Sequence, residues 1–188
     1  MLEKLTQIDK SLFIWLNSHH SPLWDNIMWF ISGKPEWIPL YLVLLGYIIY
    51  RFRWKSIAVI LAIILTITLA DQLAVIGFKN VFQRLRPSHN PDLQAVIHLV
   101  NQYRGGLYGF VSNHAANSFA LAAFVHLLFR QRIISLLFFT WATVVSYSRI
   151  YIGVHYPADI IGGAILGIVI AWLVFQLYRL LVTLIFGE

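Results

Sequence analysis

The segment from Ser148 to Asp159 holds the side chains of this sequence best suited to chemistry. It reads Ser-Arg-Ile-Tyr-Ile-Gly-Val-His-Tyr-Pro-Ala-Asp and lies between two long apolar runs. His155 and Asp159 are four residues apart, so the carboxylate can hold the imidazole in one tautomer and raise its basicity. Arg149 adds a fixed cation that suits a phosphate. An anchor at a membrane interface would carry similar residues, so other parts of the chain must decide between the two interpretations.

Two further stretches offer groups that bind anions. Lys79 and Arg86 are seven residues apart, nearly two helical turns, so we expect both to point the same way on a helix. Ser112 precedes an apolar run and fits the N-cap position, which would leave the amides of Asn113 and His114 free for an anion. Taken singly, the first stretch also fits a lipid-headgroup anchor and the second a plain helix cap.

The composition indicates an integral membrane protein. Of the 188 residues, 59% are hydrophobic and 12% are charged, and the mean hydropathy is +0.71. A soluble domain carries roughly twice that charged fraction. The length suits a single domain over residues 1–188. No cysteine is present, which excludes disulfides and thiol chemistry. We do not expect a nucleic-acid partner, because the sequence has no basic stripe on a soluble face.

Apolar periodicity predicts an all-α bundle of about six helices. The expected spans or half-spans are residues 36–50, which could extend back over 24–33, then 56–78, 113–129, 133–152 and 157–178. A polar loop over 79–111 separates the second from the third. The first 35 residues have amphipathic spacing, which is typical of interfacial helices or of a tilted pair that completes a sixth crossing.

Basic residues in short loops predict the orientation of the bundle. Arg51, Arg53 and Lys55 follow the first span, and Arg130 and Arg132 follow the third. These groups fall on one side of an up-and-down bundle, which is therefore the cytoplasmic side. The chemistry-bearing stretches then share the opposite side. We expect a multi-pass protein of the cytoplasmic membrane whose site faces the periplasm or the cell exterior.

These three stretches together resemble the type 2 phosphatidic acid phosphatase family. The pattern is Lys-x6-Arg-Pro, then Ser-x-His, then Ser-Arg-x5-His-x3-Asp, spread over about residues 71–165. The same superfamily includes bacterial soluble acid phosphatases and vanadium haloperoxidases. Because the haloperoxidases are soluble and this chain is strongly apolar, we do not expect that activity here.

The resemblance implies a metal-independent phosphatase that works through a phosphohistidine and needs no cofactor. His155 would be the nucleophile, Asp159 would orient it, and His114 would protonate the leaving oxygen. The implied phosphate ligands are Lys79, Arg86, Ser112, Asn113 and Arg149. The chemistry is consistent, because phosphoryl transfer needs mainly positioning and neutralisation of negative oxygens.

The second motif departs from the family pattern Pro-Ser-Gly-His. It reads Val111-Ser112-Asn113-His114 here. Losing the proline makes the approach to the helix less rigid. Asn113 replaces the glycine, and asparagine tolerates left-handed backbone better than most residues, so we expect the phosphate cradle to be kept.

Four other polar positions have weaker interpretations. Asp71 lies within an apolar span, where a carboxylate suggests function, although a tether to Arg149 or to a buried amide is the preferred interpretation. Arg84 could support the site by touching a headgroup or a second phosphate, or could face solvent. His19 and His20 could suggest a metal site, but an interfacial turn is preferred because no other ligands lie nearby in the sequence.

The expected function is hydrolysis of a lipid-linked phosphate or diphosphate. Undecaprenyl diphosphate is the preferred substrate, with phosphatidylglycerophosphate, phosphatidic acid and lipid A phosphates as alternatives. A lipid or anion transporter is a different class, but transporters often contain internal repeats and none is visible here. A phosphotransferase acting on another lipid is also compatible. The sequence does not determine the oligomeric state.

Overall fold

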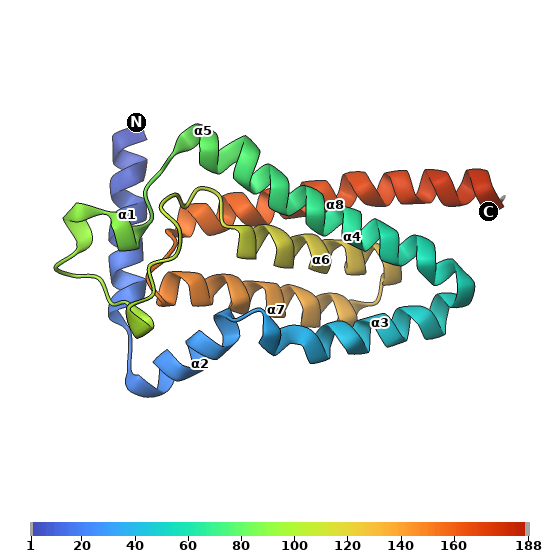
Figure 1. Ribbon diagram of the computed structural model, residues 1–188, viewed down its shortest axis with the longest axis horizontal. Coiled ribbons are helices and arrows are strands. Elements are labelled where there is room, and N and C mark those ends of the chain that lie inside the picture. Colours follow the sequence, from blue (N-terminus) through green and yellow to red (C-terminus); the bar gives the residue numbers. More distant parts are fainter. Residues whose placement is uncertain (1, 187–188) are drawn as a thin grey trace.

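A computed structural model describes residues 2–186, and the regular elements of these residues are all helices, as predicted. Short 3₁₀ turns and loops connect the helices (Figure 1). The helices are α1 (Leu2–Ser18), α2 (Pro22–Ser32), α3 (Ile38–Phe52), α4 (Ser56–Leu73), α5 (Asn80–Phe82), α6 (Asn113–Phe129), α7 (Arg132–Tyr151) and α8 (Pro157–Phe186). A π-helical segment, Ala74–Lys79, joins α4 to α5.

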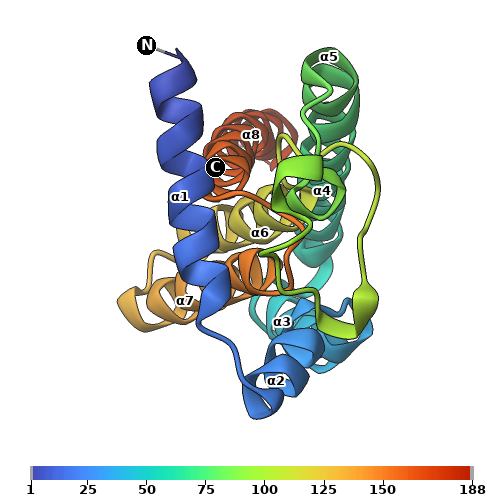
Figure 2. The same cartoon turned by 90° about the vertical axis from the view of Figure 1, so that its left-hand side faces the viewer.

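The long helices α3, α4, α6, α7 and α8 run alongside one another, whereas α1 lies across one end of them (Figures 1 and 2). The polar loop between α5 and α6 covers the same end. Large apolar side chains of α1 stay exposed, among them Leu5, Ile8 and Trp15. This placement agrees with the interfacial interpretation of the N-terminal segment and gives no sixth helix along the bundle.

Three segments among the described residues are long and apolar enough to cross a membrane: Pro35–Phe82, Arg132–Tyr151 and Pro157–Leu184. The first contains both α3 and α4, which fold back on each other at the turn around Arg53. The protein is therefore an integral membrane protein with several spans. Helix α6 lies among α4, α7 and α8 and buries much of its length.

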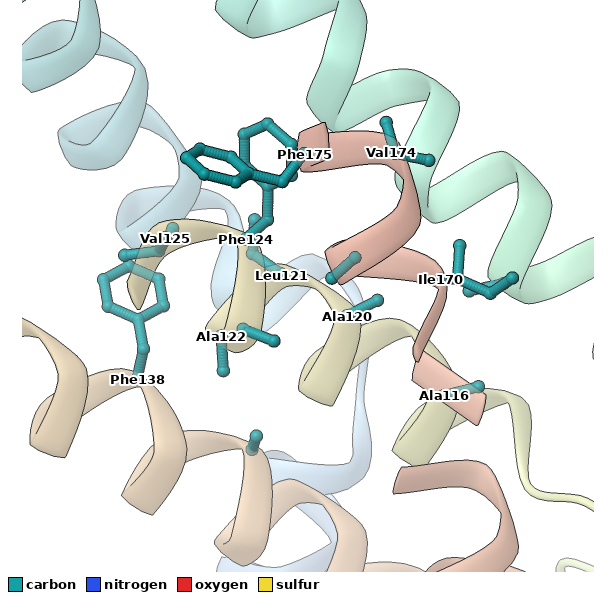
Figure 3. Close-up of a cluster of buried hydrophobic side chains, with 14 of the residues drawn as sticks. Ala116, Ala120, Leu121, Ala122, Phe124, Val125, Phe138, Ile170, Val174 and Phe175 are labelled. Carbon is teal, nitrogen blue, oxygen red and sulfur yellow. The ribbon is translucent and has the colours of Figure 1, made fainter. Parts of the chain in front are cut away.

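Small residues let α8 pack closely against α6. A Cβ at Gly163 would lie 2.6 Å from the carbonyl oxygen of Ser112, and one at Gly167 would collide with the carbonyl oxygen of Ala116. Figure 3 shows Ala116 and Ala120 at this contact, on the helix next to the one that carries Ile170. Close approach of this kind needs glycine or alanine on the facing surfaces.

Two predicted helix limits are wrong. The helix predicted over 56–78 continues through the π-helical segment to Phe82, and Gln83 then ends it with a left-handed backbone (φ 45°). The last helix continues to Phe186 rather than 178, because no proline or glycine interrupts it. The helical argument for Lys79 and Arg86 is also wrong, since Arg86 is extended (φ −67°, ψ 157°).

The contact between α6 and α8 predicts a contrast between two glycine-to-alanine substitutions. Gly167→Ala should destabilise the protein, because overpacking against backbone costs about 1–3 kcal/mol. Gly46→Ala in α3 is the matched control, since nothing lies within 4 Å of its Cβ position and alanine favours a helix. Thermal unfolding in detergent should show a lower midpoint for Gly167→Ala only. Equal midpoints would contradict the close packing.

Candidate active site

The turn between α7 and α8 sets His155 against Asp159. Gly153 has a positive φ of 85°, and a Cβ there would lie 2.7 Å from the carbonyl oxygen of His98, so the turn requires glycine. Asp159 lies in the first turn of α8, and its Oδ2 is 3.2 Å from His155 Nδ1. The same oxygen accepts the N–H of Tyr156 at 3.0 Å. The carboxylate therefore reaches back from the start of α8 to the imidazole.

The histidine and the aspartate are almost completely buried, with exposed fractions of 1% and 0%. Because Asp159 is an acceptor, His155 Nδ1 carries the proton and donates it to the carboxylate. The other ring nitrogen, Nε2, is therefore the basic one. An imidazole fixed in this tautomer can act as a nucleophile or as a base.

Arg84 pairs with Asp159 on the side away from the histidine. Its Nη1 donates to Asp159 Oδ1 at 2.9 Å, and its Nη2 donates to Asp9 Oδ2 at 2.6 Å. The two carboxylate partners of Arg84 differ from both alternatives considered for it, a headgroup or second phosphate and solvent. A Cβ at Gly109 would lie 2.8 Å from Asp159 Oδ2, so this position also needs a residue without a side chain.

The start of α6 joins the start of α8. Ser112 is the N-cap residue, as predicted, and its N–H donates to the carbonyl oxygen of Asp159 at 3.0 Å. Its hydroxyl is buried and makes no hydrogen bond with the described residues. It does not cap the helix, so the first amides of α6 have no side-chain partner from the N-cap. A helix start of this kind suits an anion.

Asp71 holds the first turns of α6 through two amides. It accepts Asn113 Nδ2 at 2.8 Å and Asn117 Nδ2 at 3.0 Å on Oδ1. These bonds agree with the preferred interpretation of Asp71 as a tether, with two partly buried amides as partners rather than Arg149. The backbone argument for Asn113 is wrong, because this residue is the first of a right-handed helix. Its side chain, not its tolerance of left-handed backbone, explains its place.

A cavity of about 740 Å³ brings most of the predicted site residues together. Seven of them line it: Asp71, Lys79, Arg86, Asn113, His114, Arg149 and His155. Ser112, Arg84 and Asp159 do not line it; the last two lie behind His155. Away from the charged end, the cavity passes between apolar side chains of α3 and α4 that include Leu44, Ile48 and Ile64.

The two arginines that line the cavity are each held in place by contacts with other protein groups. Arg86 is buried, and its Nε donates to the carbonyl oxygen of Tyr108 at 3.1 Å. Arg149 is buried as well, donates from Nη1 to the hydroxyl of Ser32, and lies over the Tyr103 ring at 5.7 Å. Buried arginines without a carboxylate partner are costly, so this end of the cavity suits an anion.

Burial and neighbouring cations lower the pKa values of Arg86 and His155, which lie outside the spanning helices. Burial is the main cause that lowers the pKa of Arg86, and the charge of Arg149 adds to it. Burial also holds the pKa of His155 well below its ordinary value, and Arg86 and Arg149 lower it further. Protonating His155 would place one more cation among others. The imidazole is therefore neutral at neutral pH, as a nucleophile requires.

Several residues at the site could not be found from sequence. Asp9 contacts it from α1, Ser32 from α2, and Lys34 and Tyr103 line the cavity. None belongs to a motif, and each reaches the site only through tertiary packing. Tyr103 lies in a loop rich in polar residues, and its aromatic side chain was the one feature of the sequence that could have suggested a role at the site.

The histidine pair near the N-terminus agrees with a turn. His19 Nδ1 lies 2.6 Å from the carbonyl oxygen of Trp15, and the His20 ring stacks on His98 at 3.7 Å. Within residues 2–186 no group of three His, Cys, Asp or Glu side chains is arranged to hold a metal ion.

Comparisons with known proteins agree with this geometry. Residues 59–182 match the family model of the PAP2 superfamily. The chain is 44% identical over 176 residues to a lipid A 4'-phosphatase of Bacteroides thetaiotaomicron, covering 92% of this chain and 78% of that protein. It is 30% identical over 171 residues to an undecaprenyl-diphosphatase of Sulfolobus acidocaldarius, covering 88% and 76%.

A solved structure shows the same arrangement of helices. The crystal structure of Aquifex aeolicus LpxE superposes with a TM-score of 0.65 at 25% identity, covering 88% of this chain and 93% of that one. The family model covers more than half of this sequence, and the Bacteroides relative is similar along nearly all of it. The chain therefore belongs to the PAP2 superfamily and is a membrane lipid phosphatase, a hydrolase of lipid phosphate esters.

Proposed function

We propose that this protein removes a phosphate from lipid A by way of a phosphohistidine and without a metal ion. The observation that carries the mechanism is the buried His155, whose Nδ1 faces Asp159 while the ring lines a cavity that also contains Lys34, Lys79, Arg86 and Arg149. The support for the substrate is the 44% identity to a lipid A 4'-phosphatase along 92% of the chain. Lipid A phosphates stood among the alternatives that the sequence left open.

In the first step, His155 Nε2 attacks phosphorus in line with the ester oxygen of the sugar. The new N–P bond forms as the P–O bond breaks. His114, in the first turn of α6, supplies a proton to the departing oxygen. Lys79, Arg86 and Arg149 neutralise the three other phosphoryl oxygens, which is the main requirement of phosphoryl transfer.

In the second step, water replaces the imidazole at phosphorus. His114, now neutral, takes a proton from the water while the oxygen attacks. The N–P bond breaks, its electron pair returns to Nε2, and inorganic phosphate leaves. Asp159 keeps the Nδ1 proton in place through both steps, so the imidazole returns in the tautomer with which it began. The Ser112 hydroxyl and the amides of Asn113 and His114 complete the cradle in this proposal.

The proposed orientation places the site at the outer face of the cytoplasmic membrane. The turns that carry Arg51, Arg53, Arg130 and Arg132 lie at the end of the bundle away from the cavity's charged residues (Figure 1). Short basic turns favour the cytoplasmic side. The lipid chains would lie along the apolar part of the cavity, with the phosphate at its charged end.

Undecaprenyl diphosphate is the second candidate substrate. The similarity to an undecaprenyl-diphosphatase covers 88% of this chain, although at the lower identity of 30%. Lys34 at the cavity would offer a cation to the second phosphate of a diphosphate. The higher identity to the lipid A enzyme favours a phosphate monoester on a sugar.

The two histidines should respond differently to the leaving group. His155→Ala should lower kcat by roughly 10⁴-fold or more on every substrate, because the nucleophile is lost. His114→Ala should lose about 10²–10⁴-fold on lipid substrates, but far less on p-nitrophenyl phosphate, whose leaving group needs no proton. His126→Ala, at the other end of α6, is the control. Wild-type rates for His155→Ala would exclude the phosphohistidine.

The acidic limb of the pH profile should lie below the ordinary histidine range. A nucleophile acts when deprotonated, and the pKa of His155 is lowered, so activity should persist as the pH falls through about 6.5. The measurement is kcat/KM on p-nitrophenyl phosphate, corrected for titration of the substrate itself. A limb at 6.5 or above would contradict a buried neutral imidazole among cations.

A panel of four lipids should separate the substrates. Purified protein is given lipid A, undecaprenyl diphosphate, phosphatidylglycerophosphate or phosphatidic acid, and free phosphate is measured with His155→Ala as the blank. We expect the highest kcat/KM on lipid A, with mass spectrometry showing the loss of one sugar phosphate. A higher value on undecaprenyl diphosphate would support the second candidate. Labelled phosphate found on another lipid, rather than free, would indicate a phosphotransferase.

A further inference from the structure

We infer that Asp9 and Arg84 are positioning residues that hold Asp159 in its bond to the catalytic histidine. The inference rests on the proposed role of His155 as nucleophile. Arg84 occupies a variable position of the Lys-x6-Arg-Pro motif, and Asp9 lies on helix α1, outside residues 59–182. The two residues join a helix at the membrane surface to the reacting imidazole.

The contacts of Asp159 use both of its oxygens. Oδ2 accepts from His155 Nδ1 and from the N–H of Tyr156. Oδ1 accepts from Arg84 Nη1 at 2.9 Å. The carboxylate cannot rotate without losing one of these bonds, and its exposed fraction is 0%. Removing Arg84 would leave a buried charge without a cation in direct contact, which is strongly unfavourable.

Arg84 is itself held on three sides. Nη2 donates to Asp9 Oδ2 at 2.6 Å, Nη1 donates to Asp159, and the guanidinium carbon lies 4.1 Å from the centre of the Tyr156 ring. The Tyr156 hydroxyl accepts a bond from Asn90 Nδ2 at 2.9 Å, which fixes the ring. A guanidinium between two carboxylates and an aromatic face has little freedom to move.

Asp9 fixes the backbone on which Asp159 lies. Its Oδ1 accepts the N–H of Ala158 at 2.9 Å, in the first turn of α8. One carboxylate of α1 therefore holds the helix start with one oxygen and Arg84 with the other. An acidic group at a helix N-terminus is also favourable electrostatically.

The geometry separates this role from phosphate binding. Arg84 and Asp159 do not line the cavity that holds Lys79, Arg86 and Arg149. Their effect must pass through the orientation and tautomer of His155, which matters for the attack on phosphorus more than for substrate affinity. Loss of the contact should therefore lower kcat and leave KM nearly unchanged.

The test uses the full chain in detergent with p-nitrophenyl phosphate as substrate. The variants are Arg84→Met, Arg84→Lys, Asp9→Asn and the double variant Asp9→Asn with Arg84→Met. Asparagine at position 9 keeps an oxygen for the N–H of Ala158 but removes the charge that faces Arg84. Lys10→Met is the matched control, because it breaks the neighbouring ion pair with Asp92 and touches nothing at the site. Thermal midpoints are measured for every variant.

We expect Arg84→Met to lower kcat by about 10- to 100-fold with KM within about two-fold, by analogy with the loss of hydrogen-bond partners that orient metal-ligating histidines. Arg84→Lys should recover part of the loss, because an ammonium can still reach one carboxylate. Asp9→Asn should lower kcat by less than Arg84→Met does. The double variant should have nearly the same kcat as Arg84→Met alone, because the two residues act through one contact. Lys10→Met should retain full activity.

Three results would overturn the inference. A rise in KM at constant kcat would assign Arg84 to phosphate binding. If the loss of kcat follows the fall in thermal midpoint and Arg84→Lys recovers no activity, then Arg84 has only a structural role. Full activity in Arg84→Met would show that Asp159 needs no partner. Failure of the proposed function is separate, because it appears as wild-type rates in His155→Ala or as no preference for lipid A.

Discussion

The close contact of α8 with α6 is the constraint on which the site depends. Gly163 and Gly167 bring the two backbones so near that a single added methyl group would meet a carbonyl oxygen. At the end of this contact, the N–H of Ser112 bonds the carbonyl oxygen of Asp159. The start of one helix carries His114 and the start of the other follows His155. Their separation is therefore set by backbone packing, which is far stiffer than side-chain contacts.

The parts of the structure that local pattern determines were predictable. The limits of α6 agree with the expected residues 113–129, because a serine N-cap and a run of apolar residues mark them in the sequence. The pairing of Asp159 with His155 was expected because the two residues are four positions apart. The convergence of the charged stretches followed from counting the spans, and the cavity brings most of those residues together.

The remaining features depend on contacts between distant residues, which one sequence does not reveal. Asp9 meets Arg84 across 75 positions, and the π-helical segment before Lys79 has no recognisable sequence signal. Arg86 reaches the cavity from an extended loop because its N–H pairs with the carbonyl oxygen of Leu107, not because of helical spacing. The preference for undecaprenyl diphosphate was weak for the same reason. The motif residues indicate that a phosphate is bound, but the group attached to the phosphate is recognised by surfaces that distant residues form together.

Helix α1 gives the protein a link between its seating in the bilayer and its chemistry. Its apolar side chains Leu5, Ile8 and Trp15 are exposed, as in helices that lie at the boundary of headgroups and acyl chains. The same helix presents Asp9 to Arg84 and to the start of α8. A helix with an apolar exposed face therefore presents a carboxylate that is linked to His155 through Arg84 and Asp159. The protein surface that faces its surroundings through Leu5, Ile8 and Trp15 is thus joined by side-chain contacts to the buried pair of His155 and Asp159.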